Sequence, residues 1–80
     1  MDEGRLDFYF FPVALDKFRP FSLINFDLYI KVENRFVLYK HRNITITKDD
    51  IHTLQENNVL YLYVQNKERK SFRQYADSNI

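Results

Sequence analysis

The stretch FDLYIKVENRFVLYK, from Phe26 to Lys40, decides the fold of this chain. Apolar residues occupy alternate positions on both sides of Glu33 and Asn34, and a period of two is typical of a half-buried β-strand. Asn34 also tolerates the positive φ that a tight two-residue turn requires. The stretch therefore predicts a β-hairpin over residues 26–41.

Strands are also expected on both sides of this hairpin. Residues 6–15, LDFYFFPVAL, are dense in aromatic side chains, and Pro12 has no N–H to give to a ladder, so this strand belongs at an edge or carries a kink. Residues 59–65, VLYLYVQ, have apolar side chains on both faces, which indicates a central strand. Residues 16–25 contain Pro20 and no clear period, and we expect a loop there.

A short helix is predicted over residues 47–57, where the period of two gives way to helical spacing. Thr47 is a good N-cap, and Asp50 stands three residues later, as in a capping box. Asn58 can supply the left-handed residue that ends the helix, so that Val59 packs back on its last turn.

A second helix is predicted over residues 67–80, with Asn66 as its cap. Phe72, Tyr75 and Ile80 share one helical stripe, together with Ala76. Because the sequence stops at a core-type residue in the middle of that stripe, we expect the chain to be cut from a longer protein. The helix would then start against the sheet and lead onward as a connector.

These elements predict an α+β fold in one small domain spanning residues 1–80. The expected architecture is a three- or four-stranded mixed or antiparallel sheet, one short helix packed on it, and the C-terminal connector helix. A chain of 80 residues makes one domain at most, and 18% aromatic residues help so short a chain to bury a core.

Composition excludes several classes of function. There is no cysteine, so neither a disulfide framework nor a thiolate metal site is possible. No apolar run approaches the ~20 residues of a membrane helix, and the acidic start MDEGRLD is unlike a signal peptide. The net charge of +1 is too balanced to indicate a nucleic-acid or membrane surface. We therefore expect a cytoplasmic protein with no membrane partner.

The sequence offers little catalytic chemistry. His41 and His52 lack metal-ligand spacing, and the helix dipole already explains Asp49 and Asp50. With Gly4 as the single glycine, no phosphate-cradling loop exists. We expect no enzymatic activity, no cofactor and no metal.

Tyrosines recur on the strand faces that lie opposite the aliphatic ones, and they admit two interpretations. Beside basic residues they could stack the bases of a single-stranded nucleic acid. Because no segment matches the RNA-recognition signature and the charge is nearly neutral, a core or partner interface is favoured over nucleic acid. The tyrosines are Tyr29, Tyr39, Tyr61 and Tyr63, and the basic residues are Lys31, Lys40 and Arg42.

Arg69 and Arg73 lie four residues apart on one face of the last predicted helix. This spacing resembles the arginine pair with which PilZ domains bind cyclic di-GMP, although the DxSxxG motif of those domains is missing. The alternative interpretation is ordinary charge on a solvated helix surface.

The order of FDLYIK, FVLYK, DDIHTLQENNVLYLYVQNKER and FRQYADSNI resembles the small N-terminal module of many bacterial HD-domain and HD-GYP signalling proteins. The resemblance spans roughly residues 11–80. In that family the module precedes a cyclic-dinucleotide phosphodiesterase or a related HD domain. The resemblance implies that any metal-binding and catalytic residues lie beyond Ile80.

We therefore expect a non-catalytic regulatory or interaction module. It would pack on the downstream domain of the same protein, or form a homodimer, through the helical stripe and the strand tyrosines. The expected interface residues are Phe72, Tyr75, Ile80, Tyr29, Tyr61 and Tyr63. The alternatives are a cyclic di-GMP sensor using Arg69 and Arg73, and a single-stranded nucleic-acid binder.

Overall fold

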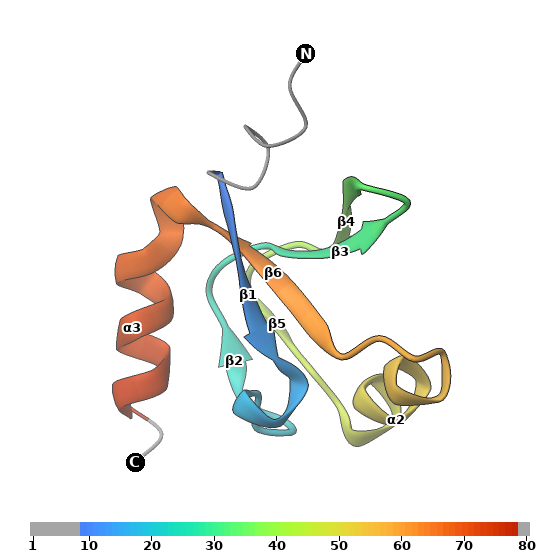
Figure 1. Cartoon of the computed structure of the whole chain (residues 1–80). Helices are drawn as coiled ribbons and strands as arrows, with labels where there is room; N and C mark the ends of the chain where they lie inside the picture. The colour runs from blue at the N-terminus through green and yellow to red at the C-terminus, as the bar shows by residue number, and fades with distance from the viewer. Residues whose placement is uncertain (1–8, 79–80) are drawn as a thin grey trace.

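Four strands pair into one antiparallel sheet in the computed structural model, which describes residues 9–78 (Figure 1). The strand order is β1-β6-β3-β4, so β6 is central and β1 lies at an edge. This arrangement confirms the predicted α+β class. Residues 6–8 of the first predicted strand, and Ile80, lie outside the described residues. The strands are β1 (Phe10–Ala14), β3 (Leu28–Val32), β4 (Arg35–Lys40) and β6 (Tyr61–Gln65).

The hairpin turn between β3 and β4 consists of Glu33 and Asn34, as the sequence predicts. Both residues have positive φ, 49° and 68°, which is the requirement of the turn type that matches strand twist in two-residue hairpins. The turn sets a register in which Tyr29 lies opposite Leu38. The register shifts between Leu28 and Tyr29, because Leu28 pairs with Lys40.

Pro12 lies at a position of β1 where the ladder needs no N–H. The Leu15 N–H donates to the Leu60 carbonyl at 3.2 Å, and the Asn66 N–H donates to the Tyr9 carbonyl at 2.8 Å. Odd-numbered residues of β1 therefore direct their backbone groups toward β6, and even-numbered residues direct theirs away from it. Pro12 pairs with Tyr63 without losing a hydrogen bond, as expected for an edge strand.

A second, two-stranded sheet was not predicted from the sequence. It pairs β2 (Leu23–Ile24) with β5 (Ile44–Thr45), so the expectation of a plain loop over residues 16–25 was wrong. A 3-10 helix (Leu15–Lys17) also lies in that segment. Strands of two residues are too short to show a period, and this pairing depends on contacts between segments that are distant in sequence.

The helix α2 (Lys48–Glu56) has the predicted ends. The Asp50 N–H donates to Thr47 Oγ1 at 3.0 Å and the Thr47 N–H donates to Asp50 Oδ2 at 3.0 Å, which completes the capping box. At the other end Asn58 has a φ of 62°, and the Val59 N–H donates to the Leu54 carbonyl at 2.9 Å. This is the hydrogen bond of a Schellman ending.

We predict that Asp50→Asn lowers the free energy of unfolding by about 1 kcal/mol at pH 7, since it removes a charged cap. The hydrogen bond from the Thr47 N–H holds the pKa of Asp50 below its ordinary value, against the opposing effect of partial burial, and Lys40 adds to the lowering. A lowered pKa means that the stabilisation is complete above about pH 4 and is lost as the pH falls through the lowered pKa.

Urea denaturation followed by circular dichroism between pH 2 and pH 7 measures this difference. Asp49→Asn is the control, because Asp49 lies in the same first turn but forms no capping hydrogen bond. We expect the control to lose only a few tenths of a kcal/mol at pH 7 through the helix dipole. A difference between wild type and Asp50→Asn that persists unchanged at pH 2 would contradict the assignment.

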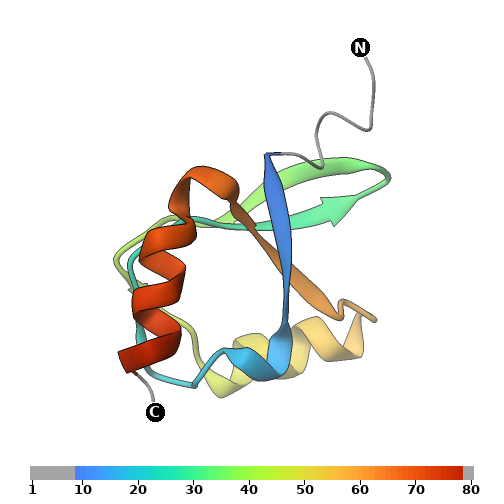
Figure 2. The same cartoon turned by 60° about the vertical axis from the view of Figure 1, so that its left-hand side comes forward.

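The last helix, α3 (Arg69–Ser78), follows a 3-10 helix (Asn66–Glu68). Figure 2 shows α3 to one side of β1, and α2 close to the end of β1 that lies away from the hairpin. Over its described length α3 packs on the core, in agreement with a helix that starts against the sheet, and its role as a connector stays a prediction. The buried core comprises Val13, Leu15, Phe18, Ile24, Phe26, Leu28, Ile46, Leu54, Leu62, Val64 and Tyr75.

Candidate functional site

One face of the four-stranded sheet carries aromatic side chains that point away from the buried core. Tyr63 on β6 lies opposite Pro12 on β1 and opposite Tyr29 on β3, and Tyr29 lies opposite Leu38 on β4. Partners in register share one face of an antiparallel sheet, so these four side chains lie together. Their neighbours along β6, Leu62 and Val64, are fully buried on the other face.

Four rings on this face pack against one another. Phe10 stacks on Phe36 at a centroid distance of 4.1 Å and meets the edge of Tyr29 at 4.9 Å, while Phe36 meets Tyr63 at 5.0 Å. Tyr61 and Leu38 border the cluster and are 47% and 38% exposed. We call this surface the aromatic face; it comprises Phe10, Tyr29, Phe36, Leu38, Tyr61 and Tyr63.

Tyr39 does not belong to the aromatic face, so the sequence grouping of four tyrosines was wrong for this residue. The register of the hairpin places Leu38, not Tyr39, opposite Tyr29. Side chains alternate along a strand, and Tyr39 therefore points to the other side, where it packs against the core. Phe10 and Phe36 were not among the predicted site residues, although each stands two residues from a position on this face.

The two predicted interface residues of α3 that the structure describes, Phe72 and Tyr75, pack within the domain itself. Tyr75 is 7% exposed, and its ring meets those of Phe26 and Phe18 at 5.8 and 6.2 Å. Phe72 is half-buried and packs against Phe11 and Phe26. Their role in a partner interface stays a prediction, and a partner would reach little of Tyr75 in this packing.

The basic residues near the hairpin are engaged by carboxylates. The Arg42 N–H donates to Asp27 Oδ1 at 2.8 Å, and Arg42 Nη2 donates to Glu68 Oε2 at 2.9 Å. Burial raises the pKa of Asp27, but the hydrogen bonds from Arg42 outweigh it and leave that pKa below its ordinary value. Lys40 Nζ lies 3.6 Å from Asp50 Oδ2. Arg42 and Lys40, two of the cations that a nucleic acid would need beside the tyrosines, are therefore paired with carboxylates, and Lys31 Nζ lies over the Phe36 ring at 5.6 Å.

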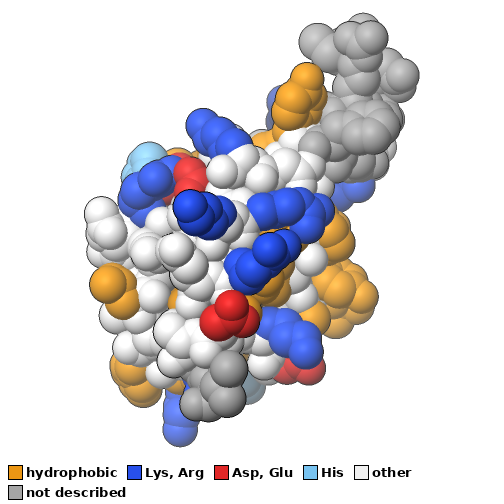
Figure 3. All heavy atoms as spheres, turned by 90° about the vertical axis from the view of Figure 1, so that its left-hand side faces the viewer, with side chains coloured by type: hydrophobic (Ala, Val, Ile, Leu, Met, Phe, Trp, Pro, Cys, Tyr) orange, Lys and Arg blue, Asp and Glu red, His pale blue; other side chains and the backbone are white. Residues whose placement is uncertain are grey.

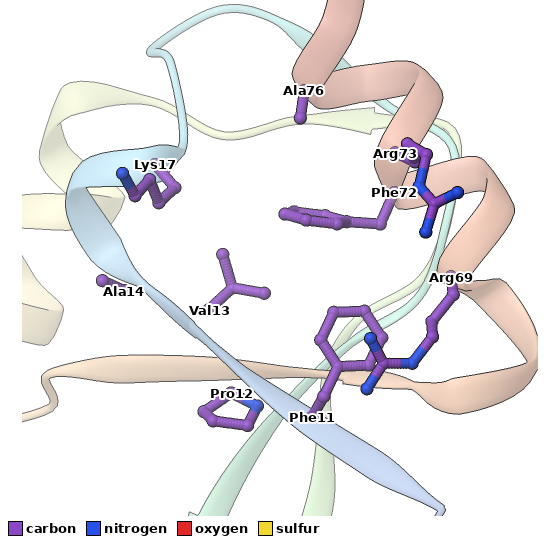
Figure 4. Close-up of a pocket in the computed structure, with 9 residues that line it drawn as sticks. All are labelled: Phe11, Pro12, Val13, Ala14, Lys17, Arg69, Phe72, Arg73 and Ala76. Carbon is purple, nitrogen blue, oxygen red and sulfur yellow. The ribbon is translucent and has the colours of Figure 1, made fainter.

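A hollow lies between the edge strand β1 and α3. It has a volume of about 510 Å³, and Figure 4 shows side chains from both elements around it. The Arg69 guanidinium carbon lies 4.3 Å from the centre of the Phe11 ring, and Arg69 Nε donates to Asn66 Oδ1 at 2.9 Å. We call this the β1–α3 pocket; it is lined by Phe11, Pro12, Val13, Ala14, Lys17, Arg69, Phe72, Arg73 and Ala76.

The β1–α3 pocket brings together both arginines of the predicted pair, and it adds Lys17, which was not among the predicted site residues. Lys17 stands more than fifty positions before Arg69, so no local spacing could have linked them. Figure 3 shows Lys and Arg side chains gathered over the face of the molecule that carries α3.

The remaining titratable candidates form no metal centre among residues 9–78, where no group of three or more ligand-type side chains occurs. His41 Nδ1 lies 4.0 Å from Asp27 Oδ1, and His52 Nε2 lies 3.3 Å from Glu56 Oε2 on the same helix. Within the part of the chain that the structure describes, neither helix is long and apolar enough to span a membrane.

No family model matches this chain, and no curated protein matches it. Among solved structures it is similar to an HDG"Y"P protein from Bdellovibrio bacteriovorus, with a TM-score of 0.76 and 22% sequence identity. The match covers 89% of this chain but 23% of that protein. The similarity shows that the fold described above recurs as a part of a much longer bacterial protein.

Proposed function

We propose that this chain is a non-catalytic regulatory or interaction module of a bacterial signalling protein, and that it packs on a downstream HD-type phosphodiesterase domain. The observation that carries the proposal is the fold similarity over 89% of this chain, which accounts for 23% of an HDG"Y"P protein. Because this chain matches 23% of that protein, the similar fold stands there beside other parts of the same chain, as the proposed module would.

The aromatic face is the surface that we assign to this contact. Aromatic side chains are enriched at the centres of protein interfaces, and contiguous exposed apolar patches mark interaction sites. The rings of Phe10, Tyr29, Phe36 and Tyr63 support one another, so they form a rigid platform that loses little conformational entropy on binding. Tyr61 and Leu38 remain exposed at its border.

The direct test is binding between the 80-residue chain and the HD-type domain encoded after residue 80, measured by calorimetry. We expect Leu38→Glu to weaken binding by roughly tenfold or more, because a charge enters an apolar contact. Leu23→Glu is the matched control: Leu23 is 63% exposed on β2, outside the aromatic face, and the same substitution there is expected to leave binding unchanged.

Three outcomes would overturn this proposal. One is a coding sequence that ends at residue 80, and another is a downstream domain that does not bind the chain. The third is a concentration-dependent dimer that Leu38→Glu abolishes and that excludes the downstream domain, which would assign the aromatic face to a second copy. Cyclic di-GMP hydrolysis by the longer protein, with and without this module, provides the regulatory readout.

A further inference from the structure

We propose that the β1–α3 pocket binds a small organic anion that carries a flat ring, of the class of nucleoside phosphates. This inference concerns a ligand and a surface that the proposed docking on the aromatic face does not involve. It rests on the charge of the pocket, on its aromatic wall and on the character of the β1 edge.

Three cationic side chains surround the hollow. Lys17 comes from the 3-10 helix after β1, while Arg69 and Arg73 come from successive turns of α3. No carboxylate lines the pocket, and within residues 9–78 none of the three forms an ion pair. By contrast, Arg42 and Lys40 elsewhere on the surface are matched by carboxylates. The pocket therefore presents positive charge that its own residues do not balance.

The cations frame an aromatic wall. In Figure 4 the ring of Phe72 points into the hollow, and the Arg69 guanidinium covers the ring of Phe11. A planar base would meet a ring and a guanidinium plane, both of which favour stacking. Stacking also holds the Arg69 guanidinium in place, and its Nε bond to Asn66 fixes the orientation further.

The size of the pocket fits a small molecule. Its volume of about 510 Å³ lies within the range of roughly 300–1,000 Å³ that is usual for small-molecule sites. Phosphate oxygens suit arginine, because the guanidinium donates two parallel hydrogen bonds to them. A base against Phe72 with its phosphate toward Arg73 would contact both an aromatic ring and a cation of the pocket, and Lys17 would add positive charge on the opposite side.

The edge of β1 favours a small ligand over an added peptide strand. Even-numbered residues of β1 direct their backbone groups away from β6, and Pro12 is one of them. A peptide that paired with this edge would find no N–H at the middle of the strand and would lose a ladder hydrogen bond there. A ligand held by side chains has no such requirement.

The test is a titration of the 80-residue chain with GMP, guanosine, inorganic phosphate and cyclic di-GMP, followed by amide NMR shifts and calorimetry. We expect GMP to bind more tightly than guanosine or phosphate alone, with shifts confined to β1, the following 3-10 helix and α3. Arg73→Gln is expected to weaken GMP binding by roughly tenfold, because a charge-assisted contact is lost. Lys17→Gln is expected to act in the same direction.

Lys70→Gln is the matched control. Lys70 is exposed on the same helix, it does not line the pocket, and the substitution removes the same charge. If Arg73→Gln and Lys70→Gln weaken binding equally, the effect is one of net charge and the pocket assignment is wrong. Absence of binding to every probe would also overturn it, as would shifts centred on the aromatic face. Tighter binding of cyclic di-GMP with the same dependence on Arg73 would support the proposal and identify the preferred member of the class.

Discussion

Replacing Phe26 with alanine is expected to lower the free energy of unfolding by about 3–5 kcal/mol. The Phe26 side chain is fully buried, and its ring meets those of Phe72 and Tyr75 on α3, both at 5.8 Å. Truncation removes the buried ring and leaves a cavity between the sheet and α3. At roughly 0.05–0.15 kcal/mol per residue, a loss of this size is a large part of the stability of so short a chain.

Urea denaturation followed by far-UV circular dichroism measures the loss. Phe21→Ala is the control, because Phe21 is 67% exposed and the same truncation there is expected to change stability by no more than about 0.5 kcal/mol. If Phe26→Ala does not fold, Phe26→Leu replaces it in the comparison. We expect Phe26→Leu to lower the free energy of unfolding by less than Phe26→Ala, but by more than Phe21→Leu. Equal losses at the two positions would show that Phe26 does not join α3 to the sheet.

Tyr75→Phe keeps the buried ring and removes only the hydroxyl. It is expected to lower the free energy of unfolding by about 1–3 kcal/mol. The Arg19 N–H donates to this hydroxyl at 2.9 Å, and Ser22 Oγ lies 2.7 Å from it. The hydroxyl therefore ties α3 to the segment between β1 and β2, which lies more than fifty positions earlier in the chain. Without it, the Arg19 N–H faces a ring edge instead of an acceptor.

Tyr61→Phe is the matched control for this experiment. Tyr61 is 47% exposed on the aromatic face, and we expect the loss of its hydroxyl to change stability by no more than about 0.5 kcal/mol. Hydrogen exchange at the Arg19 amide provides a second measurement, and faster exchange in Tyr75→Phe is expected. Unchanged protection and unchanged stability together would contradict the assigned hydrogen bond.

The sequence predicted the elements whose determinants are local. The Glu33–Asn34 turn and the Thr47–Asp50 capping box each depend on residues at most three positions apart, and both occur as expected. Pro12 likewise indicates an edge strand, because the missing N–H belongs to its own backbone and does not depend on other parts of the chain. Such features can be predicted from one sequence because few alternative conformations satisfy the same backbone groups.

The sequence could not predict what depends on tertiary pairing. The β2–β5 sheet consists of two-residue strands, and Ile24 and Ile44 are partners only because distant segments meet. The register of the hairpin determines on which side of the sheet Tyr39 lies. Alternation within a single strand shows only which residues share a side, and not which side faces the core. The β1–α3 pocket is similar: Arg69 and Arg73 are visible as a pair, but their meeting with Lys17 requires α3 to pack beside β1.

The position of Pro12 has a consequence for polymerisation. A strand added to the β1 edge of the four-stranded sheet would lack the hydrogen bond that the missing N–H of Pro12 cannot donate. The β4 edge is therefore the better edge of this sheet for pairing with a second copy. Endless fibres grow only when both borders of a sheet accept a neighbour, whereas one receptive border yields a closed pair. We therefore expect any self-association through pairing of β4 strands to stop at a twofold dimer.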